Sequence, residues 1–253
     1  MKKCFSLVLM VIFLINGLSF AASDPKVTIY YEENAQFEVI SPQGVRILMD
    51  VYKPSSISKP ATEKDILLTT HTHNDHVSAP FLNKFSGKQL FVKTGKISEG
   101  DANIQGIASA HNSTDPLPYE PEKGSNYIYI IETAGLRIAH FGDIGQDSLT
   151  PEQLNELGKI DIAFTQFYNS YSDMDLINKK GFNLMDQVKP KLIIPTHYNE
   201  ESAKYAVTKW QGQYSEKAAI EIGLSDLTNQ TKIIFMGNFG KVCGENLKLT
   251  LVN

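Results

Sequence analysis

Three of the six histidines of the chain fall within one short segment, His71-Thr72-His73-Asn74-Asp75-His76. Neutral imidazole nitrogens and carboxylate oxygens are donor atoms that zinc and related divalent cations bind well in proteins. Crowded titratable groups are costly when several become charged together, and a bound cation reverses that cost. The alternative is a solvated polar loop, which this spacing does not favour. The segment therefore predicts a metal site.

Four further residues with side chains able to bind a metal stand at the ends of apolar runs later in the chain. Taken alone, His111 reads as an ordinary strand-end histidine, Asp143 as a turn residue after Gly142, and His197 as the start of a helix. In the company of the histidine-rich segment, the same three become candidate ligands. His140 is predicted to be structural or to support a ligand from behind the site.

The elements that must position these residues are short strands. Apolar runs of strand length recur along the chain and are separated by Gly, Pro and Asn. The histidine-rich segment directly follows one of them, so a rigid strand end would carry it. The predicted strands are residues 27–31, 36–40, 45–52, 66–70, 90–93, 104–110, 127–133, 136–141, 160–165, 192–195 and 233–236.

Helices are expected between the later strands. Thr150 is a candidate N-cap, with Pro151 in the first helical position and Gln153 placed to complete a capping box. Strands dominate the first part of the chain and helices become common later, which favours two sheets covered by helices over a simple βα barrel. The other predicted helices are residues 175–188, 200–211 and 215–222.

In their order along the chain, these motifs resemble those of the metallo-β-lactamase superfamily. The matching elements are the loop His71-x-His73-x-Asp75-His76, an early strand over residues 44–50 that ends in Asp50, and the later motifs at His111, Gly142-Asp143 and His197. The resemblance covers about residues 36–200. It implies an α/β fold, a four-layer αββα sandwich, with the metal site at one edge between the two sheets.

The same resemblance implies two divalent metal ions. By it, the first is bound by His71, His73 and His111, the second by Asp75, His76 and His197, and Asp143 bridges the two. Zinc suits this nitrogen-rich set best, and manganese or iron fits the same residues. A hydroxide bridging the metals would be the nucleophile, with Asp75 orienting it and accepting its proton.

Aromatic residues near the predicted ligands are candidates for a substrate pocket, although aromatic side chains more often serve packing. They are Tyr168, Tyr171, Tyr198 and Trp210. Tyr198 directly follows His197, so it is the preferred hydrogen-bond donor to a substrate or an oxyanion.

The implied function is a metal-dependent hydrolase acting on an ester, lactone or phosphoester bond of a small molecule. Residues 143–145 and 190–198 are most similar to the branch of ascorbate-phosphate lactonases and related hydrolases. β-Lactam hydrolysis is disfavoured, because the antibiotic-hydrolysing branches generally replace the bridging aspartate and Asp143 is retained. Two alternatives stay open: a phosphodiesterase acting on nucleotides or lipid headgroups, and a non-catalytic periplasmic metal-binding protein.

The N-terminus has the three-part pattern of a secretory signal peptide. A positive start, Met1-Lys2-Lys3, precedes an apolar stretch and the small-x-small pattern Ser19-Phe20-Ala21. An uncleaved membrane anchor is the alternative, but the apolar stretch is interrupted and short for a full span. We expect residues 1–21 to be removed and residues 22–253 to form one hydrolase domain. That domain would lie in the periplasm or outside a bacterial cell, free of the membrane.

Composition sets limits on the remaining classes. The 253 residues are 42% hydrophobic and 21% charged, which excludes a disordered, collagen-like or polytopic membrane protein. The net charge of −4 does not favour nucleic acid as a partner. Loss of Cys4 with the signal peptide leaves Cys243 alone, so no intramolecular disulfide is expected and Cys243 is predicted to be a small, partly buried apolar residue. The oligomeric state stays open.

Overall fold

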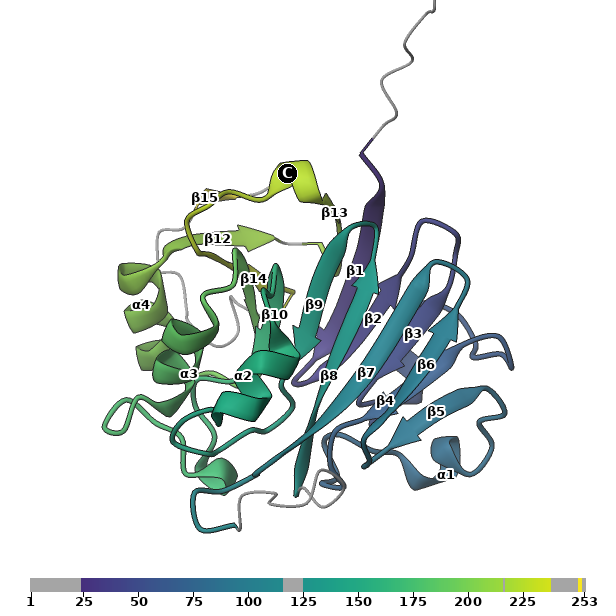
Figure 1. The fold of residues 1–253 in the computed structure, drawn as a ribbon, viewed down its shortest axis with the longest axis horizontal. Helices are drawn as coiled ribbons and strands as arrows, with labels where there is room; N and C mark the ends of the chain where they lie inside the picture. The colour runs from purple at the N-terminus through teal and green to yellow at the C-terminus, as the bar shows by residue number, and fades with distance from the viewer. Residues whose placement is uncertain (1–23, 116–124, 216, 238–249, 252–253) are drawn as a thin grey trace, which may run out of the picture.

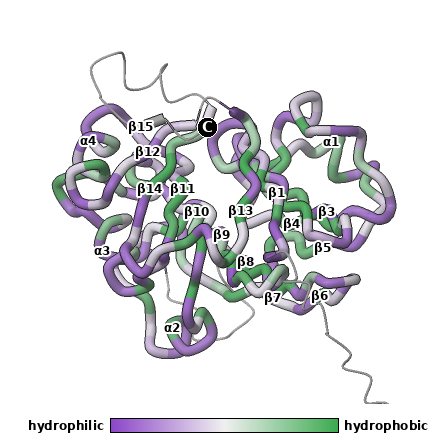
Figure 2. Tube along the Cα trace, turned by 90° about the horizontal axis from the view of Figure 1, so that it is seen from above, coloured by the Kyte–Doolittle hydropathy of each residue, from purple (hydrophilic) through white to green (hydrophobic). Residues whose placement is uncertain are grey.

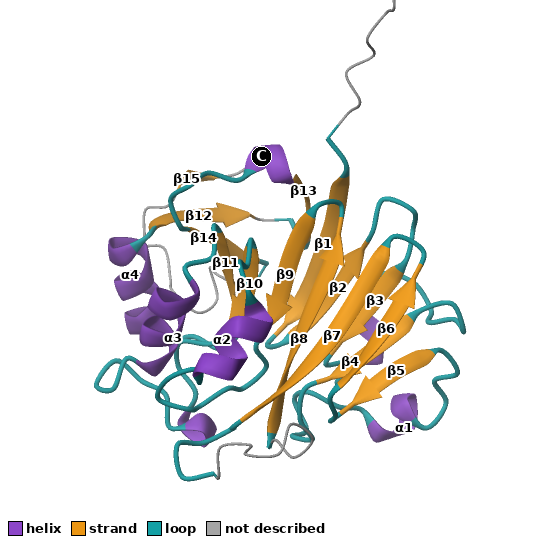
Figure 3. Ribbon diagram, in the orientation of Figure 1, coloured by secondary structure: helices purple, strands orange, loops and turns teal. Residues whose placement is uncertain are grey.

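The computed structural model describes residues 24–115, 125–215, 217–237 and 250–251. In this part of the chain two sheets pack face to face and helices cover their outer faces (Figures 1 and 3). The predicted signal peptide and both cysteines lie outside the described residues. Among the residues described, no helix has the length and apolar character needed to span a bilayer.

The first sheet has six strands in the order β13-β1-β2-β3-β4-β5. Its strands are β1 (Lys26–Glu33), β2 (Gln36–Ile40), β3 (Arg46–Met49), β4 (Ile66–Thr69), β5 (Lys88–Phe91) and β13 (Ala219–Gly223). β3, β4 and β5 run parallel to one another. The carboxyl ends of β3 and β4 therefore meet at one edge, where Asp50 and the histidine-rich loop begin.

The second sheet has nine strands in the order β15-β12-β14-β11-β10-β9-β8-β7-β6. Its strands are β6 (Gly95–Glu99), β7 (Ala102–Ser109), β8 (Asn126–Thr133), β9 (Leu136–His140), β10 (Ile162–Thr165), β11 (Leu192–Pro195), β12 (Gln211–Ser215), β14 (Lys232–Met236) and β15 (Thr250–Leu251). β9, β10 and β11 are parallel, so their carboxyl ends also open at a common edge.

The main core lies between the two sheets. Alternate side chains of both sheets fill this layer, and the rings of Phe37 on β2 and Phe164 on β10 stack with centroids 4.2 Å apart. Figure 2 shows this apolar character along the central strands. Burial of apolar surface on this scale is the main stabilising term for a chain of this size.

Helices form the outer layers. α2 (Pro151–Leu157), α3 (Lys180–Val188) and α4 (Glu200–Lys209) cover the nine-stranded sheet, and Phe182 of α3 stacks on Phe167 at 4.5 Å. On the far side, Phe81 and Leu82 of the short helix α1 (Ala79–Leu82) pack on the six-stranded sheet. The predicted four-layer αββα sandwich is therefore confirmed, with a thin outer layer over the six-stranded sheet (Figure 2).

Most predicted elements are present with small changes at their ends, and the capping box at Thr150 is confirmed. The predicted helix over residues 215–222 is wrong. That segment contributes the end of β12 and most of β13, which pairs antiparallel with β1 so that Ile222 lies opposite Val27. The edge of β1 offers backbone partners that outweigh local helix preference. The helix expected from residue 175 begins only at Lys180, and the strands β6, β12 and β15 and the short helix over residues 79–82 were not predicted.

A buried ion-pair cluster closes one end of the six-stranded sheet. The guanidinium of Arg46 donates to both carboxylate oxygens of Asp65, at 3.1 and 2.6 Å, and lies 3.3 Å from Glu38. It also donates to the carbonyl oxygens of Lys59 and Pro60 at 2.8 and 3.0 Å. Arg46 is 1% exposed and Glu38 is fully buried. The charges are thus compensated by partners within the protein.

We expect Arg46→Met to lower the free energy of unfolding by about 3–5 kcal/mol, because the buried carboxylates lose their counter-ion. Urea denaturation of the metal-loaded protein measures the change. Lys88→Met, which removes one half of the exposed Lys88–Glu99 pair, is the control and should cost less than about 1 kcal/mol. Equal effects of the two substitutions would contradict the assignment.

Candidate metal centre

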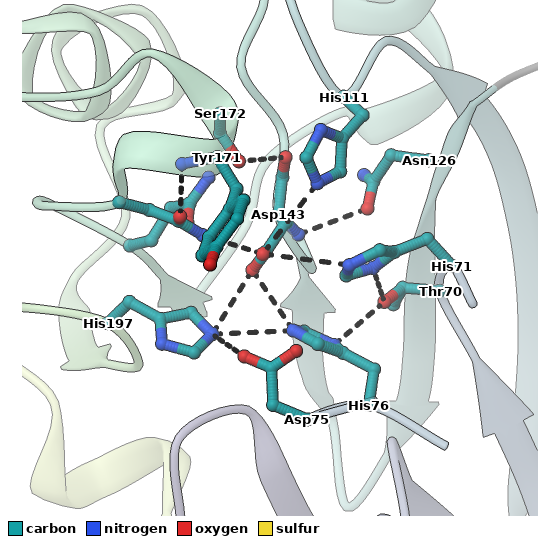
Figure 4. A network of polar contacts seen from close by, with 12 residues as sticks. Thr70, His71, Asp75, His76, His111, Asn126, Asp143, Tyr171, Ser172 and His197 are labelled. Atoms are coloured by element: carbon teal, nitrogen blue, oxygen red, sulfur yellow. Dashed lines mark hydrogen bonds and ion pairs between the residues drawn. The ribbon is translucent and has the colours of Figure 1, made fainter. Parts of the chain in front are cut away.

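The predicted ligands lie together at the edge where strand ends of both sheets meet. The loop that carries His71 to His76 follows β4, and His111 follows β7. Asp143 follows β9 and His197 follows β11. The structure thus brings all seven predicted ligand residues to one place, and Figure 4 shows several of them around the carboxylate of Asp143.

One group of donor atoms gathers on one side of that carboxylate. The ligand atoms of His71, His73, His111 and Asp143 lie within 4.8 Å of one another. Asp143 Oδ2 is 3.6 Å from Nε2 of His71 and 3.8 Å from Nε2 of His111. His71 and His111 are buried, whereas His73 is exposed at the mouth of the site.

A second group gathers on the other side. The ligand atoms of Asp75, His76 and His197 also lie within 4.8 Å of one another. Asp143 Oδ1 is 3.2 Å from Nε2 of His76 and 3.3 Å from Nε2 of His197. Each oxygen of Asp143 therefore faces a different group, which is the placement that a bridging ligand needs.

The donor atoms fit two divalent cations. Nε2 of His71 and of His111 are buried and have no hydrogen-bond partner among the described residues. Nε2 of His76 and Nε2 of His197 face each other at 3.3 Å. A buried polar atom without a partner costs about 1–3 kcal/mol, and a cation bound by these nitrogens removes that cost. Imidazole and carboxylate together make a donor set typical of zinc.

The pKa shifts of the ligand residues also favour a cation at this site. Burial, aided by the charge of His76, lowers the pKa of His71 to about 3. Burial alone would also lower the pKa of His76, but the carboxylates of Asp50 and Asp143 outweigh it and raise the pKa to about 10. Burial likewise opposes ionisation of Asp143, and the charges of His76 and His197 outweigh it, so its pKa lies well below the usual range. Near neutral pH the proton on His76 thus supplies positive charge where a cation would.

A buried carboxylate fixes His76 from behind. Asp50 Oδ2 lies 2.9 Å from Nδ1 of His76 and 2.7 Å from Nε2 of His140. The backbone N–H and the hydroxyl of Thr70 both donate to Asp50 at 2.8 Å. The contact with Asp50 leaves Nε2 of His76 directed at Asp143. His140 lies behind the site against Asp50 and belongs to neither donor group, as the sequence predicts.

Asn169 is a site residue that the sequence did not reveal. Its side-chain amide donates to Asp143 Oδ2 at 2.6 Å and to Gln166 at 2.8 Å. It lies in the loop after β10, where an asparagine is common in any turn, so no pattern singled it out. This hydrogen bond fixes the orientation of the Asp143 carboxylate, so that one oxygen faces each donor group.

The glycine before Asp143 has a structural reason. Gly142 has a φ of +54°, and a Cβ there would lie 2.5 Å from Oδ1 of Asn126. That oxygen accepts the backbone N–H of Asp143 at 3.0 Å. Only glycine permits both the left-handed backbone and this close approach. The turn therefore aims Asp143 between the two groups.

An open cavity of about 320 Å³ adjoins the second group. It is lined by Tyr31, Glu33, Asn34, Asp75, Tyr168, Asn169, Ser170, Tyr171, Thr196, His197 and Tyr198. Tyr198 lies in this wall and its ring packs edge-on against Phe235 at 5.2 Å; its role as a hydrogen-bond donor stays a prediction. Trp210, the fourth aromatic candidate, is not part of the lining and packs on Phe182.

Comparison with known proteins agrees with the fold and the site. The family model of the β-lactamase superfamily domain matches residues 28–197. The matched stretch runs from β1 through the whole ligand set to His197. The chain belongs to the β-lactamase superfamily.

Curated relatives and solved structures give similar results. The chain is 28% identical over 191 residues to a metal-dependent hydrolase of Thermococcus onnurineus, covering 66% of this chain and 82% of that protein. It is 27% identical over 222 residues to one of Polynucleobacter asymbioticus, covering 71% and 76%. A candidate zinc-dependent hydrolase of the metallo-β-lactamase superfamily from Thermotoga maritima superimposes with a TM-score of 0.61 at 20% identity, over 83% of this chain and 98% of that chain. The similarity to the lactonase branch stays a prediction.

We expect zinc binding to the metal-free protein to release about one proton near pH 7.5, because a ligand imidazole must lose its proton. The source is His76, whose pKa is raised to about 10. Isothermal titration calorimetry in buffers of different ionisation enthalpy counts the protons. Zinc affinity should rise with pH toward about pH 10, since protons compete below that value.

In the metal-free protein, rising pH has the opposite effect: it lowers the contribution of His76 to folding stability. The pKa of His76 is raised from 6.5 to about 10, so its charge stabilises the fold below pH 6.5 and this contribution is lost as pH rises through about 10. Zinc binding with no buffer-dependent heat at pH 7.5 would contradict the assignment of a protonated His76.

Proposed function

We propose that this chain is an exported hydrolase that cleaves an ester, lactone or phosphoester bond of a small molecule, using two divalent metal ions. The broader class is a metal-dependent hydrolase of the metallo-β-lactamase superfamily, the activity named for its relatives. The observation that carries the proposal is Asp143. Its two oxygens face one donor group each, and a solvent-open cavity adjoins the second group.

The chain offers all the ligands that two ions require. His71, His73, His111 and Asp143 would hold one ion, and Asp75, His76, His197 and Asp143 the other. When bound, two divalent cations act as Lewis acids, lowering the pKa of water and stabilising negative charge that develops on the substrate oxygen. Zinc is the expected metal on donor chemistry.

The protein residues supply orientation and proton transfer. Asp75 has a half-exposed side chain in the cavity wall, with Oδ2 3.7 Å from Nε2 of His197. From there the carboxylate oxygen of Asp75 that is not bound to the ion would accept a proton from the attacking water and return it to the leaving group. Asp50 holds the ring of His76, and Asn169 holds Asp143, so the donor atoms stay in place as charge moves. Tyr198 is proposed to donate a hydrogen bond to the substrate oxygen.

The two alternatives receive less support. Among the described residues, no lysine or arginine lines the cavity, whereas sites for nucleotide or lipid phosphates normally use such side chains. A metal-binding protein without turnover needs no cavity beside its ions. Here the cavity exposes Asp75 and reaches His197, so a substrate has access to the second donor group.

We expect the zinc-loaded protein to hydrolyse at least one member of a panel containing 4-nitrophenyl butyrate, a five-membered lactone and bis(4-nitrophenyl) phosphate. Asp75→Asn should keep metal at the first donor group, because Asp75 is not part of it, and should lower kcat about a hundredfold, the scale of a lost general base. Steady-state kinetics and metal analysis by mass spectrometry provide the two readouts.

His73→Ala is the contrasting variant. It removes a member of the first donor group, so metal and activity should be lost together. If Asp75→Asn turns over substrate at the wild-type rate with both ions bound, the proposed role of Asp75 is wrong. If the metal-loaded wild type acts on no substrate of the panel, the proposed bond classes are wrong.

Export has a separate test. The start Met1-Lys2-Lys3, the apolar stretch and Ser19-Phe20-Ala21 predict a mature protein that begins within a few residues of Ala22. N-terminal sequencing of the protein recovered from the periplasm or the medium of a bacterial host measures this. A chain recovered with Met1 in place would refute cleavage.

A further inference from the structure

The cavity beside the second donor group has an uneven charge. Two carboxylates, those of Glu33 and Asp75, belong to its wall, and no lysine or arginine of the described residues does. Asp75 is one of the predicted metal ligands, but Glu33 belongs to neither donor group. Glu33 is therefore a carboxylate in the wall with no part in holding the metals.

The lysine paired with Glu33 does not remove this negative charge from the cavity. Lys53 lies 3.5 Å from Glu33, and both side chains are about half exposed, so the pair is well screened. Lys53 itself is not part of the lining. The neighbouring Tyr52 is affected by the same negative charge. Burial raises the pKa of its hydroxyl most, and the charges of Glu33 and Asp75 raise it further.

Aromatic rings form the other walls. Tyr31, Tyr168, Tyr171 and Tyr198 all line the cavity. Tyr171 is 77% exposed and its ring lies edge-on to that of His73, with centroids 6.1 Å apart. It lines the same cavity as Asp75 and His197 of the second donor group, and Figure 4 draws its ring on the side of the site where His197 lies. Its backbone N–H donates to the side chain of Asn169 at 2.9 Å, so the turn that carries the ring is anchored to the metal site.

This combination selects by charge and shape. A flat group gains contact with tyrosine rings, and a positively charged group gains further from the rings and from Glu33. A carboxylate or phosphate placed against Glu33, away from the metal ions, meets like charge on the protein. The volume of about 320 Å³ is at the lower end of the range for small-molecule sites.

Resting on the proposed hydrolase function, we propose that this cavity selects substrates whose part beside the scissile bond is planar or apolar and either uncharged or positively charged. Glu33 is the residue that excludes anionic substrates, and Tyr171 is the ring on which the planar group stacks.

The charge test uses three 4-nitrophenyl esters of equal length whose acyl chains end in trimethylammonium, tert-butyl or carboxylate. The zinc-loaded wild type should prefer the first two over the anionic ester by about tenfold in kcat/KM, on the scale of one charge at a partly screened site. Glu33→Gln should reduce the cation-to-anion ratio about fivefold, and Glu33→Lys should reduce it further.

Glu32→Gln is the matched control. It makes the same change of charge on the adjacent residue of β1, whose side chain is not part of the lining, so the ratio should not change. An equal effect of Glu32→Gln and Glu33→Gln would mean that the net charge of the protein, and not the position of Glu33 in the cavity wall, sets the ratio. That result would overturn the role of Glu33.

The stacking test uses the 4-nitrophenyl ester of phenylacetic acid. Tyr171→Ala should raise KM about threefold to tenfold, while Tyr171→Phe keeps the ring and should retain the wild-type KM. Loss in both variants would mean that the hydroxyl matters and the ring does not, which contradicts stacking.

A binding measurement separates this proposal from the hydrolase function. Saturation-transfer NMR on the zinc-loaded protein compares phenyltrimethylammonium with benzenesulfonate, and preference for the cation should disappear in Glu33→Gln. Preference without hydrolysis of any ester, lactone or phosphodiester of the panel would refute the proposed function and leave the cavity proposal standing. Hydrolysis of all three esters at equal rates, with no effect of Glu33→Gln, would overturn the cavity proposal and leave the hydrolase function intact.

Discussion

The buried carboxylate of Asp50 is the interaction on which the site depends. Asp50 follows β3 of one sheet, and its partners are Thr70 and His76 beyond β4 and His140 at the end of β9 in the other sheet. A buried carboxylate is tolerated only when its oxygens are fully hydrogen-bonded. The two sheets must therefore meet with their strand ends in register, and this requirement also turns the metal-facing nitrogen of His76 toward Asp143.

The charges of the neighbouring residues compensate one another. Asp50 and Asp143 flank His76, and their charges overcome its burial and raise its pKa to about 10. In the same small volume, burial lowers the pKa of His71 and of His111. The site is thus built to hold positive charge at its centre and neutral imidazoles around it. A divalent cation satisfies both conditions more fully than one proton does, because it also bonds the unpaired nitrogens.

The sequence predicted the ligands well and their surroundings only in part, for physical reasons. Each motif follows an apolar strand, and the resemblance of their order to that of the metallo-β-lactamase superfamily implied that His71, Asp143 and His197 share one site. Asn169 and Glu33 have no such signal, since their importance comes from contacts between segments distant in sequence. The same limit explains the wrong helix over residues 215–222, whose strand β13 exists only because the edge of β1 pairs with it.

Chemistry and selectivity are placed on different parts of this fold. The groups that set the metal site, such as Asp50, His76 and Asp143, are buried at strand ends and constrain one another. The side chains of Glu33 and Tyr171 stand in the open cavity wall, and Tyr171 is joined to the buried network through its backbone N–H, which donates to Asn169. Substitution of a wall residue can therefore change which molecule enters while the donor geometry stays the same. Substitution in the buried network would disturb the donor geometry itself, because both oxygens of Asp50 already have hydrogen-bond partners.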